Sequence, residues 1–480
     1  MRTSAFGRRT LLAAGGGLLA GAWRGAAAQP PVPPLPPLAA QIPLPLAGIT
    51  VVPGMPGYDA ARPVFNGRFD RRPAAVVFCR NVADVQEAVR WARRTGMPFR
   101  ARSGGHSYEG LSTLDGGVVA DLSALNWAQV DPASGLAVVG AGARLLDVAT
   151  ALSAQGVVLP AGTCPGVGIA GLALGGGVGY YARAYGLTCD RLREVQVVDA
   201  TGAVLTANSA TNPDLFWASR GGGGGNFGVA TSFTFDTVPL ARVVLVEVAW
   251  HWPDAATVID AWQRWAPTVD SRLSTSLAIF GQGADLVSLR GLFTGADAEV
   301  GALLAPILAA GTPSSVSWWG ASTLDAATYL GGAPAAHATF KNSSAIADSL
   351  LGPEAIAALL ARLAAPPNPW NLVSLFAFGG AVAAVDPTAT AFPHRRSLFD
   401  LQYQAYWSDP GLAAAQVGWV RDTRLAMAPF TGGAYVNYLD LEIADWATAY
   451  YGPNRRRLRQ VKTAYDPGRF FNAPQGIRPL

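Results

Sequence analysis

The sequence predicts an α+β fold with more than one domain, and three observations lead to that prediction. Residues 63–239 alternate short β-branched runs with segments of helical periodicity. Glycine-rich loops lie at the ends of several predicted strands in this region. Residues 240–430 differ in composition, with longer strands, alanine-rich helices and many tryptophans. A chain of 480 residues, half of them hydrophobic, is long enough for two or three packed units.

The first domain is predicted to contain several short strands and one clear amphipathic helix. Strands are predicted at 74–78, 99–101, 118–120, 137–139 and 195–205, the last with a turn at Thr201-Gly202. A helix is predicted at 84–94, because apolar residues from Val85 to Ala92 recur on one helical face. Gly96 follows as the stop signal of this helix.

Residues 240–430 are expected to form a second domain, in which 243–250 is a strand of a sheet that could carry a binding face. The last fifty residues return to short motifs and one short helix. Leu458 and Val461 anchor this helix, and Asp466-Pro467 ends it because proline cannot continue the helical hydrogen bonds.

The N-terminus is typical of an export signal. Arg8-Arg9 precedes an apolar run that ends near Ala22, and small residues follow up to Ala28. The run is shorter than the ~20 residues that span a bilayer, so an anchor is disfavoured. Residues 1–28 are therefore predicted to be a twin-arginine signal peptide, giving a periplasmic or secreted protein with no membrane partner after cleavage. Residues 29–62 are expected to form a proline-rich leader, whose proline-dense part at 30–45 is flexible or extended.

Charge and cysteine content exclude several classes of protein. Only 14% of residues are charged, the net charge is +4, and Arg455–Arg457 are expected on a surface helix, so nucleic-acid binding is not expected. Three cysteines make no disulfide framework, and no zinc-ligand spacing occurs, so no metal site is predicted. Cys79 and Cys189 are expected to be structural, and whether they pair is left open.

Four segments are dense in glycine: 103–105, 140–142, 171–179 and 221–228. Glycine lets the backbone approach a ligand closely and present N–H groups to anionic oxygens. Four such loops in one domain predict a cofactor that contains a pyrophosphate. A Rossmann fingerprint at 175–179 is the rival interpretation, but Pro165 and further glycines precede it where a strand would be required.

Several spaced motifs occur together between residues 63 and 480. They are RSGGHSYEG (102–110), AGTCPGVGIAGLALGGGVG (161–179), RGGGGGNFGV (220–229), FPHR (392–395), YVNYLD (435–440), YYGPN (450–454) and YDPGRFFNAPQGI (465–477). In this combination the chain resembles the berberine-bridge-enzyme-like FAD-linked oxidases of the vanillyl-alcohol-oxidase group. The resemblance implies a two-part PCMH-type FAD-binding domain, formed by 63–239 and completed by 431–480. It also implies that 240–430 form a substrate domain with an antiparallel sheet backed by helices.

The same resemblance implies FAD attached bicovalently through His106 and Cys164. Both are chemically suitable, since neutral imidazole has a free nucleophilic nitrogen and an ionised thiol is a strong nucleophile. A lone histidine or cysteine is more often a surface or packing residue, but the intact motifs favour attachment. Further cofactor contacts are expected from Arg102, Ser103, Gly104, Gly105, Ser107, Gly168, Gly171, Gly175, Gly176, Gly228, Val229 and Asn472.

The resemblance places a catalytic base at Tyr438. A phenol with an ordinary pKa of about 10 acts at pH 7 at a cost of about 4 kcal/mol, unless a cation or concerted proton transfer helps. Gln402 stands where some relatives carry a glutamate base, and its amide is expected to orient substrate or flavin. Tyr108 is expected to line the substrate side, and Tyr435 is a weaker candidate that supports the same segment.

Three positions near the expected flavin bear on specificity. Val178 and Phe378 stand where some relatives have tyrosines, so the pocket is expected to lose two hydroxyl groups. Val167 stands where a small residue leaves space for dioxygen, which favours an oxidase over a dehydrogenase.

The predicted function is a secreted FAD oxidase that oxidises a C–OH group of a small molecule. Hydride would pass to flavin N5 and dioxygen would become hydrogen peroxide. A carbohydrate hemiacetal, oxidised to a lactone, is the leading substrate class, because tryptophans of the second domain could stack on sugar rings. The alternatives are a tailoring oxidase or dehydrogenase of a secondary metabolite and a flavin-loaded binding protein with little turnover.

Overall fold

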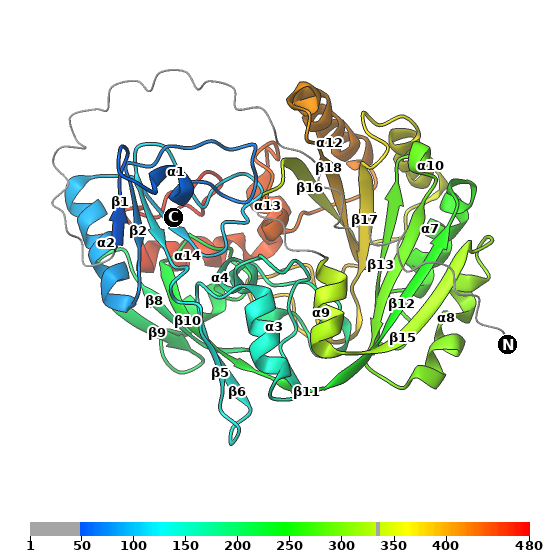
Figure 1. Ribbon diagram of the computed structural model, residues 1–480, viewed down its shortest axis with the longest axis horizontal. Coiled ribbons are helices and arrows are strands. Elements are labelled where there is room, and N and C mark those ends of the chain that lie inside the picture. The colour runs from blue at the N-terminus through cyan, green and yellow to red at the C-terminus, as the bar shows by residue number, and fades with distance from the viewer. Residues whose placement is uncertain (1–48, 333–336) are drawn as a thin grey trace.

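Seven antiparallel strands form the largest sheet of the computed structural model, which describes residues 49–332 and 337–480 (Figure 1). The predicted signal peptide and most of the predicted leader lie outside the described residues. Residues 49–62 do not form part of the leader, because they pack onto the first domain as a short strand and a helical turn. Within the part of the chain that the structure describes, no helix is both long enough and apolar enough to cross a bilayer.

Two sheets build the first domain. The smaller has the order β1-β2-β4-β3, with β1 Ile49–Val51, β2 Ala75–Phe78, β3 Phe99–Arg102 and β4 Val118–Asp121. The larger has the order β5-β6-β10-β8-β9, with β5 Ala128–Val130, β6 Leu136–Gly140, β8 Leu192–Val198, β9 Val204–Asn208 and β10 Val229–Asp236. A separate ribbon pairs β7 Val157–Val158 with β11 Val238–Pro239. The strands expected in this domain are thereby confirmed.

The predicted helix at 84–94 is α2, Val82–Thr95. The Asn81 side chain accepts a hydrogen bond from the Asp84 N–H at its start, and Gly96 ends it in the left-handed conformation. The other helices of this domain are α1 Tyr58–Ala61, α3 Leu145–Ser153, α4 Ile169–Leu174, α5 Ala182–Tyr185 and α6 Pro213–Ala218. The end of α2 thus follows the glycine stop signal in the sequence.

The second domain carries the seven-stranded sheet, ordered β15-β12-β14-β13-β17-β18-β16. Its strands are β12 Arg242–Trp250, β13 Leu273–Phe280, β14 Val287–Phe293, β15 Ser315–Ser322, β16 Phe340–Ala347, β17 Leu372–Ala377 and β18 Phe399–Tyr406. Its helices are α7 Ala255–Trp265, α8 Val300–Leu308, α9 Thr323–Gly331, α10 Pro353–Ala364, α11 Gly380–Ala384 and α12 Ala413–Met427. The expected antiparallel sheet backed by helices is confirmed.

The two faces of this sheet have different environments. One face packs against α7, α8, α10 and α12, which lie together on the outer side in Figure 1. Strand β18 shows the alternation clearly: Phe399, Leu401 and Tyr403 belong to the core beneath those helices. Successive side chains of a strand point to opposite faces. The residues between them therefore face the first domain.

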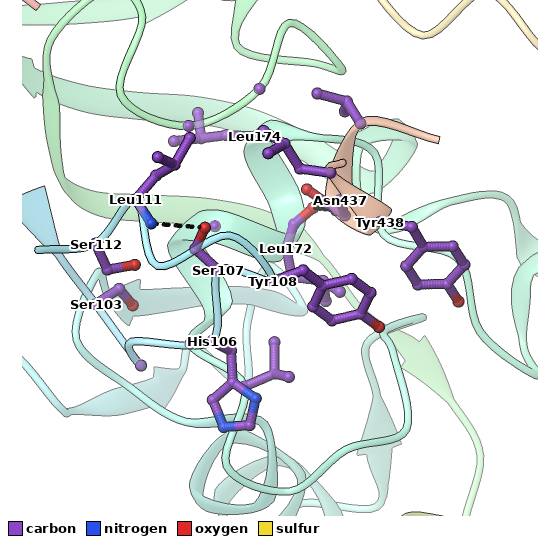
Figure 2. A pocket seen from close by; sticks show the side chains of 18 of the residues that line it. Ser103, His106, Ser107, Tyr108, Leu111, Ser112, Leu172, Leu174, Asn437 and Tyr438 are labelled. Atoms are coloured by element: carbon purple, nitrogen blue, oxygen red, sulfur yellow. Dashed lines mark hydrogen bonds between the residues drawn. The ribbon is translucent and has the colours of Figure 1, made fainter. Parts of the chain in front are cut away.

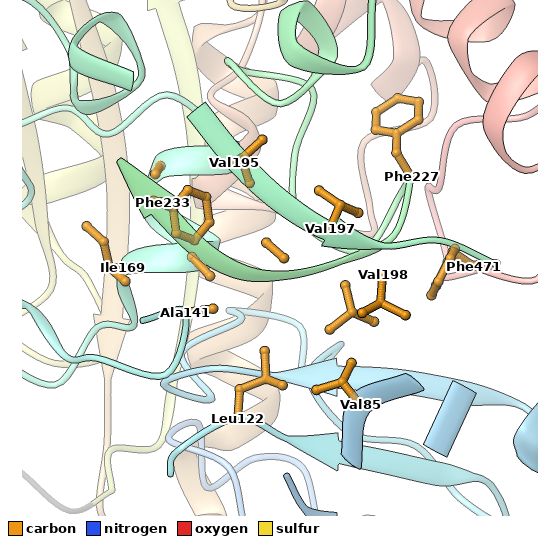
Figure 3. Packing of buried hydrophobic residues seen from close by; sticks show 14 of the residues in the cluster. Val85, Leu122, Ala141, Ile169, Val195, Val197, Val198, Phe227, Phe233 and Phe471 are labelled. Carbon is orange, nitrogen blue, oxygen red and sulfur yellow. The ribbon is translucent and has the colours of Figure 1, made fainter. Parts of the chain in front are cut away.

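The last fifty residues complete the core of the first domain. Helices α13 Trp446–Tyr451 and α14 Arg455–Tyr465 belong to this segment, and α14 ends before Pro467 as expected. Leu458 and Phe471 pack into the same hydrophobic cluster as Val197 of β8 and Phe233 of β10. Figure 3 shows Phe471, Val197 and Phe233 in this cluster. The first domain is therefore built from two stretches of chain separated by the second domain.

Candidate active site

A cavity of about 470 Å³ lies between the first domain and the uncovered face of the seven-stranded sheet (Figure 2). Three regions line it: glycine-rich loops of the first domain, strands β13, β17 and β18, and the C-terminal segment. A volume of this size is typical of sites for cofactors and small molecules. The cavity is therefore the candidate active site.

The glycine loops give one wall of this cavity an exposed backbone. Gly171 and Gly225 line the cavity, and a Cβ at either position would meet no atom within 4 Å. Arg100 is the only arginine or lysine among the lining residues. An anionic group held here would therefore depend mainly on backbone N–H donors, as glycine-rich anion sites do. This cradle fits the diphosphate of FAD.

His106 lines the cavity at the end of its glycine turn. Its ring stacks on Phe65 with centroids 3.8 Å apart and an angle of 14°. Burial, with a smaller contribution from the Arg144 charge, lowers the pKa of His106 to about 4. The imidazole is therefore neutral at physiological pH, and a neutral imidazole keeps one ring nitrogen available as a nucleophile.

Cys164 lies on the neighbouring loop, and its side chain is exposed to the cavity. The protein walls around it raise the pKa of the thiol, and a hydrogen bond with Thr163 opposes this in part. The two loops touch: a Cβ on Gly166 would lie 2.8 Å from His106 Nε2. Cys79 and Cys189 are buried free thiols, so all three cysteines are unpaired.

The three predicted catalytic residues come together in the cavity. The rings of Tyr108 and Tyr438 are parallel within 2°, with centroids 5.6 Å apart (Figure 2). Gln402 Nε2 donates to the Tyr108 hydroxyl at 2.8 Å. The structure therefore brings one residue from each of the three lining regions to the same place.

Burial raises the pKa of Tyr438 well above its ordinary value, and the charge of Asp400 raises it further. Asp400 also lines the cavity, and burial raises its pKa to about 8. Its Oδ2 is buried without a hydrogen-bond partner. The sequence left open whether a cation assists Tyr438; the principal charge acting on Tyr438 is instead this carboxyl group.

Asp400 was missed by the sequence analysis, although a signal was present. It begins a series of alternate residues of β18 that line the cavity: Asp400, Gln402, Gln404 and Tyr406. Gln404 Nε2 donates to the Ser374 hydroxyl of β17 at 2.7 Å. The period of two in FDLQYQAY predicts one polar face. Of the residues on this polar face, only Gln402 was predicted to belong to the site.

Tyr435 lines the cavity, but its hydroxyl oxygen accepts hydrogen bonds from the neighbouring glycine loop. The backbone N–H groups of Gly177 and Val178 donate to the Tyr435 hydroxyl at 2.8 and 3.3 Å. Asn437 Nδ2 donates to the same oxygen at 2.8 Å. Tyr435 therefore supports the glycine loop, in agreement with its assignment as the weaker candidate.

Ten of the fourteen predicted cofactor residues line the cavity: His106, Cys164, Ser103, Gly104, Gly105, Ser107, Gly168, Gly171, Gly228 and Val229. Arg102 and Asn472 do not. The Arg102 guanidinium is buried in an ion pair with Asp121 at 2.5 Å. The Asn472 side chain accepts a hydrogen bond from Arg100 at 3.3 Å. Both side chains hold the cavity wall from behind.

Gly175 and Gly176 also lie outside the cavity lining. A Cβ on Gly175 would lie 2.0 Å from Asn437 Oδ1, so this glycine is required by close packing. Gly176 has a φ of +124°, which a residue with a side chain rarely adopts. These glycines shape the turn that follows α4.

The expectation that the pocket loses two hydroxyl groups is only half right. Val178 lines the cavity as expected. Phe378 does not, because its side chain is fully buried against Phe392 and Val382. Val167 lines the cavity on the loop of Cys164.

Comparison with known proteins agrees with this geometry. A family model described as an FAD binding domain matches residues 73–208, and one described as berberine and berberine like matches residues 434–478. The uncharacterized FAD-linked oxidoreductase YgaK of Bacillus subtilis is 40% identical over 91% of this chain and 98% of its own length. The xylooligosaccharide oxidase of Thermothelomyces thermophilus is 32% identical over 86% of this chain and 89% of its own.

Two further similarities bear on substrate class. The aclacinomycin-N/aclacinomycin-A oxidase of Streptomyces galilaeus is 31% identical over 86% of this chain and 87% of its own. Among solved structures, a chitooligosaccharide oxidase superposes with a TM-score of 0.85. It is 27% identical and covers 92% of this chain and 98% of its own.

The raised pKa of Asp400 predicts a pH-dependent effect on stability. The folded state holds a proton that the unfolded state releases above pH 4, so this group destabilises the fold increasingly as pH rises from about 4 to about 8. We expect Asp400→Asn to raise the melting temperature more at pH 8.5 than at pH 5. Asp422→Asn, at an exposed position of α12, is the control. An equal effect of Asp400→Asn at both pH values contradicts the prediction.

Proposed function

The chain belongs to the berberine and berberine-like family of FAD-linked oxidoreductases, and on that basis we propose that it oxidises a carbohydrate hemiacetal to a lactone. The polar face of β18 supports this substrate class most directly. Gln402 and Gln404 present amide groups along one wall of the cavity. Ser374 and Ser276 add hydroxyl groups from the neighbouring strands. Amides and hydroxyls both donate and accept, as recognition of a polyhydroxylated ring requires.

We assign the flavin tethers to His106 and Cys164. A neutral imidazole and an exposed thiol line one cavity on touching loops, which is the chemistry that two covalent bonds to one ring system need. Backbone N–H groups near Gly171 and Gly225 would hold the diphosphate. When bound, the flavin supplies the hydride acceptor and passes two electrons to dioxygen, which with two protons gives hydrogen peroxide.

Tyr438 and Asp400 would remove the hydroxyl proton of the substrate. With its raised pKa, Tyr438 cannot persist as a phenolate near neutral pH. We infer that Tyr438 takes the proton as the C–H hydride leaves, and that the Asp400 carboxylate receives the proton in turn. A carboxyl with a pKa of about 8 is well matched to this role, since general bases act best with a pKa near the working pH.

One lining residue bears on the electron acceptor. Val167 lines the cavity on the loop of Cys164, at the position where the family resemblance implies space for dioxygen, and this supports dioxygen as the acceptor. The alternative, oxidation of a secondary metabolite, is favoured by the similarity to aclacinomycin oxidase.

Export by the twin-arginine route through Arg8-Arg9 also stays a proposal. A mature N-terminus at Gln29 in the exported protein supports it, and an uncleaved cytoplasmic chain contradicts it.

The substrate class is tested by mixing the purified protein anaerobically with mono- and oligosaccharides and then admitting air. We expect a sugar to bleach the visible flavin band, and air to restore it with release of hydrogen peroxide. If a secondary-metabolite alcohol bleaches the flavin and no sugar does, the alternative replaces the proposal. If dithionite alone bleaches it, turnover itself is in doubt and the low-turnover binding protein becomes the better description.

The tethers are tested by precipitating the protein with acid. We expect the flavin to stay with the wild-type protein and with each of His106→Ala and Cys164→Ala, and to be released from the double variant. Absorbance of the supernatant measures the released fraction. Release from the wild-type protein, or retention by the double variant, contradicts the assignment.

The proton-transfer pair predicts a pH profile. The rate of anaerobic flavin reduction should rise through pH 7 and level above about 8, because Asp400 must be ionised to accept a proton. Asp400→Asn should remove this dependence, and both Asp400→Asn and Tyr438→Phe should slow reduction by about 100-fold, as loss of general-base catalysis does. Stopped-flow absorbance measures the rates. An unchanged pH profile in Asp400→Asn would exclude Asp400 as the acceptor.

A further inference from the structure

Lys341 of β16 is a buried cation that bridges two distant parts of the chain. Its Nζ lies 2.6 Å from Glu109 Oε1 and 2.5 Å from Asp440 Oδ1. All three side chains are at most 6% exposed. Glu109 belongs to the first domain, Lys341 to the second and Asp440 to the C-terminal segment, so one ammonium group connects the three regions that line the cavity.

The two carboxylates are adjacent in sequence to the stacked tyrosines. Glu109 follows Tyr108 directly, and Asp440 is two residues after Tyr438. The parallel rings are 5.6 Å apart. Lys341 itself does not line the cavity. Any influence of Lys341 on the reaction must therefore act through the segments that it holds.

The second oxygen of each carboxylate is also paired. Arg68 binds the second oxygen of Glu109 at 2.6 Å, and the Ser343 hydroxyl donates to Asp440 Oδ2 at 2.5 Å. The partly exposed Glu442 lies 3.6 Å from Lys341. Buried ion pairs often stabilise a fold no more than apolar residues of similar size would. Apolar residues, however, make no directional contacts. Hydrogen bonds from one ammonium group fix the orientation of both the Glu109 segment and the Asp440 segment.

We propose that Lys341 is a positioning residue that sets the distance and the parallel orientation of Tyr108 and Tyr438. The same bridge connects the loop of the proposed flavin tether, His106, to the segment of the proposed base. The proposal rests on the function proposed above. It adds a residue outside the cavity on which proton transfer depends.

The test compares Lys341→Met with Arg68→Met. Both variants remove one cation from Glu109, but only the first breaks the link to Asp440. We expect Lys341→Met to reduce the limiting rate of flavin reduction by about 100-fold, as a displacement near 1 Å does, with little change in the half-saturating substrate concentration. Arg68→Met should keep most of the rate. Equal losses in the two variants overturn the proposal.

A third variant separates positioning from the harm done by unpaired buried charges. Lys341→Met combined with Glu109→Gln and Asp440→Asn removes the three charges that are at most 6% exposed and leaves that of Arg68, which is 19% exposed. This variant also serves if the single variant does not fold. We expect this triple variant to recover thermal stability while its reduction rate stays low. Recovery of the wild-type rate would show that the charges need only be balanced, and would overturn the proposal.

A crystal structure of the triple variant gives a readout that needs no substrate. We expect the Tyr108 and Tyr438 rings to lose their parallel arrangement. Unchanged rings contradict the positioning role. If no sugar reduces the wild-type flavin but the rings separate in the variant, the proposed function fails while the positioning role stands.

Discussion

The structure depends on the seven-stranded sheet, whose one face packs against helices and whose other face lines the cavity. Because side chains alternate along a strand, β18 places Leu401 and Tyr403 beneath the helices and Gln402 and Gln404 in the cavity. The hydrophobic packing against α7, α10 and α12 therefore fixes the register of the polar residues as well. A slip of one residue would expose the core and remove the polar wall of the cavity together, so the same contacts determine the stability of the sheet and the placement of that wall.

The cavity has few fixed charges, and this governs its chemistry. Its lining includes one arginine, one carboxyl group and a histidine whose low pKa keeps it neutral. Burial raises the pKa values of Asp400 and the tyrosines because little nearby charge opposes it. The charged side chains of Lys341, Glu109 and Asp440 are buried nearby and do not line the cavity. The ion pairs of Lys341 are thus separated from the weakly charged groups that line the cavity.

Local patterns in the sequence predicted much of the fold. Helix α2 follows from its apolar periodicity with Gly96 at its end, and the hairpin of β8 and β9 from its turn. The motifs also predicted most residues that line the cavity. Arg102 and Phe378 do not line the cavity, because their side chains contact Asp121 and Phe392 instead, and such contacts are not visible in the sequence. The role of Asp400 was missed because an aspartate shows an unusual pKa only once tertiary packing has buried it.

The division of the first domain into two stretches of chain has a consequence for biosynthesis. Phe471 and Leu458 complete a core most of whose other members lie more than two hundred residues earlier in the chain. During vectorial synthesis, the N-terminal stretch must wait on the ribosome's surface with that core open, while the second domain can fold as soon as it emerges. The cavity closes only after the last residues have left the exit tunnel. A nascent chain that stalls before residue 431 therefore lacks the C-terminal part of the cavity lining.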